Sequence, residues 1–173
     1  MIKIQGLKKK FDRNEALCGI GLSIDSNIIF AVVGPDGAGK TTLMRILTGI
    51  MRPDEGSINI LGHDIVKNPE AAKKDIGYLS QKFSLNPTLT VAENIDFFGT
   101  LYEVPRSEKE ERLKRLLDFS RLGPFKDRQA GKLSGGMKQK LALCCALIHT
   151  PRILLLDEPT TGVDPVTRQD FWQ

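Results

Sequence analysis

Histidine, cysteine and long apolar segments are all scarce in this sequence. Its 173 residues include two histidines and three cysteines. The cysteines form neither a Cys-x-x-C pair nor a Cys/His cluster, which argues against a zinc site. Cys144 and Cys145 stand in an apolar run, so we expect them to pack as small core residues.

No apolar segment approaches the roughly 20 residues that cross a bilayer. No signal-type apolar region follows the first lysines. We therefore expect a soluble, cytoplasmic chain that reaches a membrane only through another protein.

The composition is that of an ordinary globular protein, 40% hydrophobic and 27% charged. The length predicts one domain, or a core with one inserted subdomain. The net charge of +4 suits a phosphate ligand, an acidic membrane surface or nucleic acid, and selects none of them. The run Lys8–Lys10 is too short for a nucleic-acid patch, so we expect it to be a solvated strand end.

The most informative stretch is Gly34–Thr42, which reads Gly-Pro-Asp-Gly-Ala-Gly-Lys-Thr-Thr. The apolar run Ile28–Val33 before it predicts a buried strand, and Leu43–Leu47 after it predicts a helix. A strand, a glycine-rich turn and a helix in this order are the context of a phosphate-binding loop. In such a loop, backbone N–H groups point at the anion, Lys40 neutralises phosphate charge and the Thr41 hydroxyl ligates Mg²⁺. The alternative, a glycine-rich turn with a solvated lysine, is disfavoured by the flanking elements.

The remaining periodicity predicts an α/β chain. Short strands are expected at residues 1–4, 16–24, 57–61 and 76–79, the first three in a small antiparallel sheet beside a parallel core. Thr90 and Glu93 match a capping box that opens a helix, and Ser107 and Glu110 match another. Their inner faces are expected to carry Ile95, Phe98, Leu101 and Tyr102 in the first helix, and Leu113, Leu116 and Leu117 in the second.

The last third of the chain predicts a second group of polar residues. The loop Leu133–Gly136 enters a helix that runs to His149, and a buried strand at residues 153–156 ends at Asp157 and Glu158. Asp157 is expected to hold Mg²⁺, and Glu158 to act as general base or to orient the attacking water. Ser134, Gly135 and Gly136 predict either an ordinary N-cap or a second anion site. A second anion site makes sense if it serves the nucleotide of a neighbouring subunit.

These residues together resemble the ATP-binding cassette ATPases, over nearly the whole chain. The matching stretches are Gly34–Thr42 (Walker A), Gln81 (Q-loop), Leu133–Lys140 (signature), Ile153–Pro159 (Walker B) and Thr161–Asp164 (D-loop), in the order of that family. The resemblance implies a phosphate-loop ATPase core over residues 1–81 and 139–173, with a small antiparallel β subdomain. It also implies a helical subdomain over residues 82–138, whose surface usually receives the coupling helices of a transporter.

The resemblance further implies a role for each matching residue. ATP would be held by Phe11, Gly34, Pro35, Asp36, Gly37, Ala38, Gly39, Lys40, Thr41 and Thr42, with Ser134, Gly135 and Gly136 closing over the ATP of the other subunit. Mg²⁺ would be held by Thr41, Gln81 and Asp157, and catalysis would rest on Glu158, Gln81 and Lys40. Asp164 would lie at the dimer interface. Phe11 would stack on adenine, although a core residue at a strand end is an equal alternative.

Three positions depart from the family pattern. Asp36 and Met137 replace the commoner Asn and Gln, and Met137 with the following Lys-Gln-Lys resembles the subgroup that serves ABC-2 type exporters of drugs or lipids. The family's switch histidine has no counterpart, because residues 165–173 contain no histidine and neither His63 nor His149 matches its place. We therefore expect a C-terminally truncated domain that binds Mg-ATP and hydrolyses it poorly.

The sequence thus predicts the ATP-hydrolysing subunit of an ABC-type exporter. Its expected partners are an integral membrane subunit and a second nucleotide-binding domain, in a homo- or heterodimer on the inner face of the cell membrane, without nucleic acid. A non-transport ABC ATPase acting on ribosomes or DNA is the alternative. DNA-repair types carry long coiled coils that do not fit between Gln81 and Leu133, and ribosomal types usually carry two cassettes. A phosphate-loop kinase is disfavoured by the signature stretch.

Overall fold

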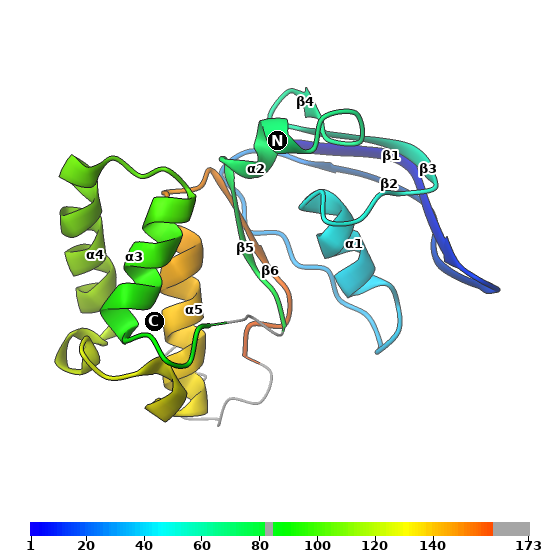
Figure 1. The fold of residues 1–173 in the computed structure, drawn as a ribbon. Coiled ribbons are helices and arrows are strands. Elements are labelled where there is room, and N and C mark those ends of the chain that lie inside the picture. The colour runs from blue at the N-terminus through cyan, green and yellow to red at the C-terminus, as the bar shows by residue number, and fades with distance from the viewer. Residues whose placement is uncertain (82–84, 161–173) are drawn as a thin grey trace. The chain divides into compact units, whose positions relative to one another are not determined.

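The computed structural model describes residues 1–81 and 85–160. Its contacts divide the chain into two compact units, the first covering Met1–Ile76 and the second beginning at Gly77 (Figure 1). Each unit has its own sheet and helices, which confirms the predicted α/β class. The predicted helical subdomain of residues 82–138 stays a prediction. Among the described residues, no helix combines the length and the apolar character needed to cross a membrane.

The first unit is built on an antiparallel sheet with the strand order β2-β1-β3-β4. Its strands are β1 (Ile2–Phe11), β2 (Asn14–Ile24), β3 (Glu55–Ile60) and β4 (His63–Asp64). In Figure 1, β1 lies alongside β2 and β3. Ile2 and Ile4 are buried in alternation, and a register shift at Gly6, with φ of 58°, lets Leu7 be the next buried residue. The predicted antiparallel sheet is confirmed.

Strand β1 is longer than predicted because the lysine run takes part in it. Lys8 forms an ion pair with Glu55 at 2.7 Å, and Lys9 forms one with Asp54, also at 2.7 Å. The hydrogen bond from Lys9, together with one from the backbone N–H of Lys10, lowers the pKa of Asp54. The expectation of a solvated strand end is confirmed, with acidic partners on the neighbouring strand and turn.

The prediction of a buried strand at Ile28–Val33 is wrong. These residues belong to neither sheet of the described structure, and the side chains of Ile29 and Val33 are 103% and 92% exposed. A strand requires a neighbour that accepts and donates its backbone hydrogen bonds. Within the first unit both edges of the sheet, β2 and β4, leave this segment unpaired, so apolar character alone does not make it a strand.

Two helices complete the first unit, α1 (Lys40–Leu47) and the single turn α2 (Glu70–Lys73). Helix α1 buries Leu43, Ile46 and Leu47, the i, i+3, i+4 pattern of one helix face. Gly49, with φ of 70°, follows the C-cap Thr48, as expected of a glycine that ends a helix. The predicted helix after the glycine-rich loop is therefore confirmed.

In its described part, the second unit combines a two-stranded sheet, β5 (Ile76–Leu79) and β6 (Ile153–Leu156), with three helices. These are α3 (Val91–Leu101), α4 (Arg106–Ser120) and α5 (Gly135–Leu147), with the 3₁₀ turns η1 (Gly123–Phe125) and η2 (Ala130–Lys132). The three helices pack side by side (Figure 1). Strand β5 forms where it was predicted and is largely buried. Strand β6 was predicted to be buried and is only partly so, because Leu155 is buried and Leu154 is exposed.

The core between the helices is apolar and includes both adjacent cysteines. Its fully or nearly buried members are Val91, Ile95, Leu117, Leu122, Ala130, Leu133, Leu141, Cys144, Cys145 and Ile148. Burial raises the pKa of Cys144 to about 11 and also raises that of Cys145. Both cysteines are therefore uncharged packing residues at neutral pH, as predicted. Leu113 and Leu116 pack against this core, but Leu101 is 62% exposed, so its predicted inward position is wrong.

One of the two predicted capping boxes is present. The Thr90 hydroxyl accepts the N–H of Glu93, and the Glu93 carboxylate accepts the N–H of Thr90 at 2.7 Å. That backbone hydrogen bond lowers the pKa of Glu93. The box predicted at Ser107 and Glu110 is wrong, because the N-cap of α4 is Pro105, two residues before Ser107, and the helix begins at Arg106. Ser107 therefore already lies within the first turn.

Candidate functional site

The loop before α1 has the backbone of an anion-binding turn. Gly37 and Gly39 adopt φ of 81° and 86°, in the left-handed region that glycine enters without strain. A Cβ on Gly39 would lie 2.3 Å from the carbonyl oxygen of Ala16, so only glycine fits there. The N–H of Ala38 donates to Pro35 at 3.2 Å and closes the turn. The loop thus leads into the N-terminus of α1, and the positive end of a helix dipole favours an anion.

Lys40 places its ammonium group inside this loop. Its Nζ donates to the carbonyl oxygens of Gly34 and Pro35, at 2.9 Å each. The side chain therefore folds back over the turn, with its ammonium group hydrogen-bonded to two carbonyl oxygens of the loop. A positive charge and the positive end of a helix lie in one place, a donor set that fits a phosphate group. Thr41 and Thr42 follow in the first turn of α1, both half-buried.

In the second unit, three predicted polar residues come together at the ends of β5 and β6. The N–H of Asp157 donates to the carbonyl of Leu79 at 2.9 Å, which joins the two strand ends. The Asp157 side chain is buried at 3% exposure. Gln81 donates from Nε2 to Oε2 of Glu158 at 3.2 Å. The structure therefore brings Gln81, Asp157 and Glu158 into one site, from positions 76 and 77 residues apart.

Glu158 has an unusual backbone for a residue with a side chain, since its φ is 51°. A left-handed conformation costs a non-glycine residue roughly 1 kcal/mol or more, and such residues concentrate at functional sites. Tyr78 also contributes here, because its hydroxyl lies 3.4 Å from Oδ2 of Asp157. No role was predicted for Tyr78, since a tyrosine in a short apolar strand carries no signal of a polar contact.

The start of α5 confirms Ser134 as an N-cap. Its hydroxyl accepts the N–H of Met137 at 3.3 Å, and the helix begins at Gly135. An N-cap serine accepts with its oxygen and still has its own proton to donate. Ser134 and Gly135 are exposed, so this helix end is accessible to an anion. The two interpretations of Ser134 are therefore compatible.

The other predicted positions stand as follows. Phe11 ends β1 with 44% of its surface exposed and with the Lys9 ammonium 5.6 Å from its ring centroid, so it is not a core residue. Pro35, Asp36 and Ala38 are exposed on the loop. Asp164 lies outside the described residues.

Within residues 1–81 and 85–160, no group of three or more His, Cys, Asp or Glu could hold a metal. The hydroxyl of Thr41 and the carboxylate of Asp157 are oxygen ligands of the type that Mg²⁺ prefers.

Known proteins resemble this chain over nearly its whole length. The model of the ABC transporter family matches residues 17–161. The chain is 47% identical over 175 residues to the "Probable multidrug ABC transporter ATP-binding protein YbhF" of Escherichia coli strain K12, covering 100% of this chain and 30% of that protein. It is 39% identical to the Nod factor export ATP-binding protein I of Rhizobium sp. strain N33, covering 99% of this chain and 57% of that protein.

Further similarity comes from a resistance protein and from solved structures. The daunorubicin/doxorubicin resistance ATP-binding protein DrrA of Streptomyces peucetius is 35% identical, with 99% of this chain and 52% of that protein covered. A solved dimeric ATP-binding cassette, in a post-hydrolysis state bound to ADP and Pi, is 28% identical with a TM-score of 0.85, covering 98% of this chain and 78% of that one. The chain spans between about a third and about three fifths of the length of these curated relatives.

Proposed function

Because this chain belongs to the ABC transporter family, we propose that it is the ATP-hydrolysing part of an exporter. The observation that carries this proposal is the contact between Gln81 and Glu158, at the end of the strand that also delivers the buried Asp157. A carboxylate with an amide beside it can hold a water molecule between a hydrogen-bond acceptor and a donor. In the first unit, the phosphate-type loop at Lys40 offers a binding site for the phosphates of a nucleotide.

The roles of the residues follow from their chemistry. The loop amides and the ammonium of Lys40 hold the phosphates, with Lys40 exchanging its carbonyl contacts for phosphate oxygens. Glu158 accepts the proton of the attacking water, and Gln81 orients that water. Asp157 and Thr41 are the residues that would hold Mg²⁺, which neutralises phosphate charge when bound. Phe11 offers an exposed ring for stacking on adenine.

A second copy, or a related domain, completes the site. Ser134 and Gly135 form an exposed, capped helix end in the second unit and provide donors for an anion. Head-to-tail pairing would place this helix end over the nucleotide held by the partner. Closure over ATP then provides the free energy that moves the membrane subunit, because ATP binds the closed pair more tightly than the open one. The dimeric form of a solved relative supports this arrangement.

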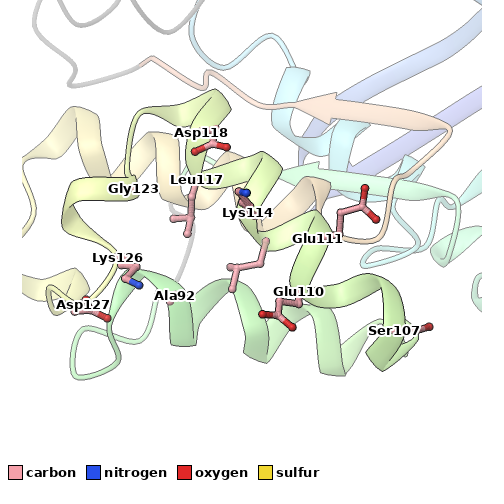
Figure 2. Close-up of a pocket in the computed structure, with 11 residues that line it drawn as sticks. Ala92, Ser107, Glu110, Glu111, Lys114, Leu117, Asp118, Gly123, Lys126 and Asp127 are labelled. Carbon is pink, nitrogen blue, oxygen red and sulfur yellow. The ribbon is translucent and has the colours of Figure 1, made fainter.

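The contact for the membrane subunit lies between α3 and α4. A groove of about 700 Å³ opens there, and its apolar lining residues are Leu113, Leu117 and Ala92, the last two of which are labelled in Figure 2. The lining has more acidic than basic residues, namely Glu110, Glu111, Asp118 and Asp127 against Lys114 and Lys126. Apolar contacts together with an excess of acidic side chains suit a short basic amphipathic helix on the inner side of a membrane protein.

The names of the relatives support export over the alternative class. They refer to multidrug transport, Nod factor export and daunorubicin resistance, and none refers to ribosomes or DNA. We propose that the protein works as a peripheral subunit on the inner face of the membrane. The transported compound is selected by the membrane subunit.

Copurification tests this proposal. The tagged protein is expected to purify from detergent extracts with a polytopic membrane protein, and the double charge reversal Glu110→Lys/Glu111→Lys to lose that partner. The matched control Glu15→Lys/Asp25→Lys changes the net charge equally on exposed residues of the first unit and should keep the partner. Copurification with ribosomes or DNA instead, or equal retention of the membrane partner by both double variants, would contradict the proposal.

A further inference from the structure

One buried polar side chain in the second unit has no role in the site described above. Asn94 is 1% exposed and lies in α3, directly after the capping box. Burying an amide without partners would cost several kcal/mol, so its contacts indicate what it is for. All hydrogen bonds of the Asn94 side chain go to the segment Asn86–Thr90, the five residues that precede α3.

The side-chain amide of Asn94 is hydrogen-bonded to the backbone of the segment Asn86–Thr90. Its Nδ2 donates to the carbonyl oxygens of Asn86 at 3.1 Å, Leu89 at 3.2 Å and Thr90 at 2.9 Å. Its Oδ1 accepts the N–H of Asn86 at 3.0 Å. Only an asparagine-sized amide provides donors and an acceptor in this arrangement. The segment Asn86–Thr90 is thus held in one conformation by a single side chain.

The same segment is hydrogen-bonded to the residues just before Ser134. The N–H of Ala130 donates to Leu89 at 2.8 Å, and that of Gly131 donates to Pro87 at 2.9 Å. Thr90 and Gln129 form a β-bridge. A Cβ on Gly131 would lie 3.0 Å from the Pro87 oxygen, so the two segments are in close contact.

These hydrogen bonds between Pro87–Thr90 and Gln129–Gly131 form a short ladder, and only a few residues separate it from Ser134. Residues Ala130–Lys132 form the tight turn η2, and Leu133 donates its N–H to Ala130 at 3.2 Å while its side chain is buried in the helical core. Ser134 is the next residue. Its position therefore depends on where the ladder holds Ala130 and Gly131.

We propose that Asn94 is a positioning residue for the Ser134 end of α5: by fixing Asn86–Thr90, it fixes the segment that places Ser134 and Gly135. The expected effect of Asn94 on turnover rests on the proposed function. The claim that Asn94 positions Ser134 does not. Asn94 touches no nucleotide. It acts through the ladder, so its loss should impair the step that needs Ser134 and leave binding at the Lys40 loop unchanged.

The test compares Asn94→Asp with Ile148→Ala. Asp has the same shape, but its carboxylate would face three carbonyl oxygens. Ile148→Ala destabilises the same core at the end of α5 opposite Ser134, without touching the ladder. In nucleotide-free protein, hydrogen exchange at the amides of Ala130 and Gly131 should become about ten-fold faster or more in Asn94→Asp and stay near wild type in Ile148→Ala. In turnover, Asn94→Asp should lower kcat by about ten-fold with little change in KM, and Ile148→Ala should leave both near wild type.

Gly131→Ala provides a second route if Asn94→Asp does not fold. It disturbs the ladder from the opposite side and should reproduce the same split between kcat and KM. Unchanged exchange at Ala130 and Gly131 would overturn the proposal. So would an unchanged kcat in Asn94→Asp, or an equal fall of kcat in Ile148→Ala. If the wild-type protein shows no ATP turnover, the proposed function fails, and the exchange measurement still decides the structural claim.

Discussion

Lys40 is the residue on which we expect nucleotide binding to depend most directly. Its ammonium lies between two loop carbonyls, so it is already placed before a phosphate arrives, and little side-chain entropy is lost on binding. Preorganisation of this type also explains why neighbouring glycines matter. The loop can only curl around the lysine if Gly37 and Gly39 adopt left-handed backbone angles.

We expect Lys40→Ala to weaken Mg-ATP binding by about ten-fold or more, which corresponds to about 1.4 kcal/mol. The lost charge is the one nearest the phosphates. Isothermal titration with a slowly hydrolysed ATP analogue measures the affinity. Lys10→Ala is the matched control, because it removes the same charge from an exposed strand position paired with Glu15. Equal affinity in the two variants would contradict the role of Lys40.

The fit of Gly39 gives a stability prediction within the same loop. Gly39→Ala combines a left-handed φ with a Cβ placed 2.3 Å from the Ala16 oxygen. Gly62→Ala has a similar φ of 93° but open space around the new methyl group. Both should lose about 1 kcal/mol for the backbone angle, and Gly39→Ala should lose roughly 1–3 kcal/mol more for the clash. Urea unfolding measures the difference in stability between the two variants. Equal unfolding midpoints for Gly39→Ala and Gly62→Ala would contradict the predicted clash.

Helix starts show how local chemistry can be predicted and where it misleads. The pair Thr90 and Glu93 forms the box that its spacing predicts, whereas Ser107 and Glu110 have the same spacing and form none. The difference is Pro105, which favours the extended conformation of an N-cap and starts α4 before Ser107 is reached. Spacing alone therefore identifies a capping box only when no nearby proline offers an earlier start.

Thr90→Ala should destabilise the second unit by about 1 kcal/mol, since it removes a side-chain acceptor at a helix N-terminus. Ser107→Ala is the matched control and should change stability by no more than about 0.5 kcal/mol. The lowered pKa of Glu93 adds a pH dependence. A carboxylate with a lowered folded pKa stabilises the protein above its unfolded pKa, and this contribution is lost as pH falls through the folded pKa.

Thermal melts at pH 7 and at pH 3 measure both effects. The difference in Tm between wild type and Glu93→Gln should be larger at pH 7 than at pH 3. A larger loss for Ser107→Ala than for Thr90→Ala would mean that the cap assignments are reversed.

Pairing between distant segments is the part that the sequence predicts least well. The loop at Gly34–Thr42 and the acids after β6 could be predicted because each is a local pattern with its own chemistry. Ile28–Val33 could not be assigned correctly, because its conformation depends on a neighbouring strand and not on its own apolar character. Tyr78 and Asn94 were missed for a related reason. Their partners lie at Asp157 and in the turn before α3, and no periodicity indicates such contacts.

Taken as a whole, the molecule divides its nucleotide chemistry between two units. The first holds the phosphate-type loop and Lys40, and the second holds Gln81, Asp157, Glu158 and the capped helix end at Ser134. A division of this type allows ATP binding and hydrolysis to be separated by mutation. Removing the general base should stop turnover without weakening the loop that binds phosphate.

The most direct test of the ATPase assignment is the variant Glu158→Gln, compared with wild type for both Mg-ATP affinity and phosphate release. The amide keeps the size and the hydrogen-bonding reach of the side chain but cannot accept a proton from water. We expect the same dissociation constant within about two-fold and phosphate release slowed by about 100-fold or more. Phosphate release at the wild-type rate would contradict the assignment of Glu158 as the general base.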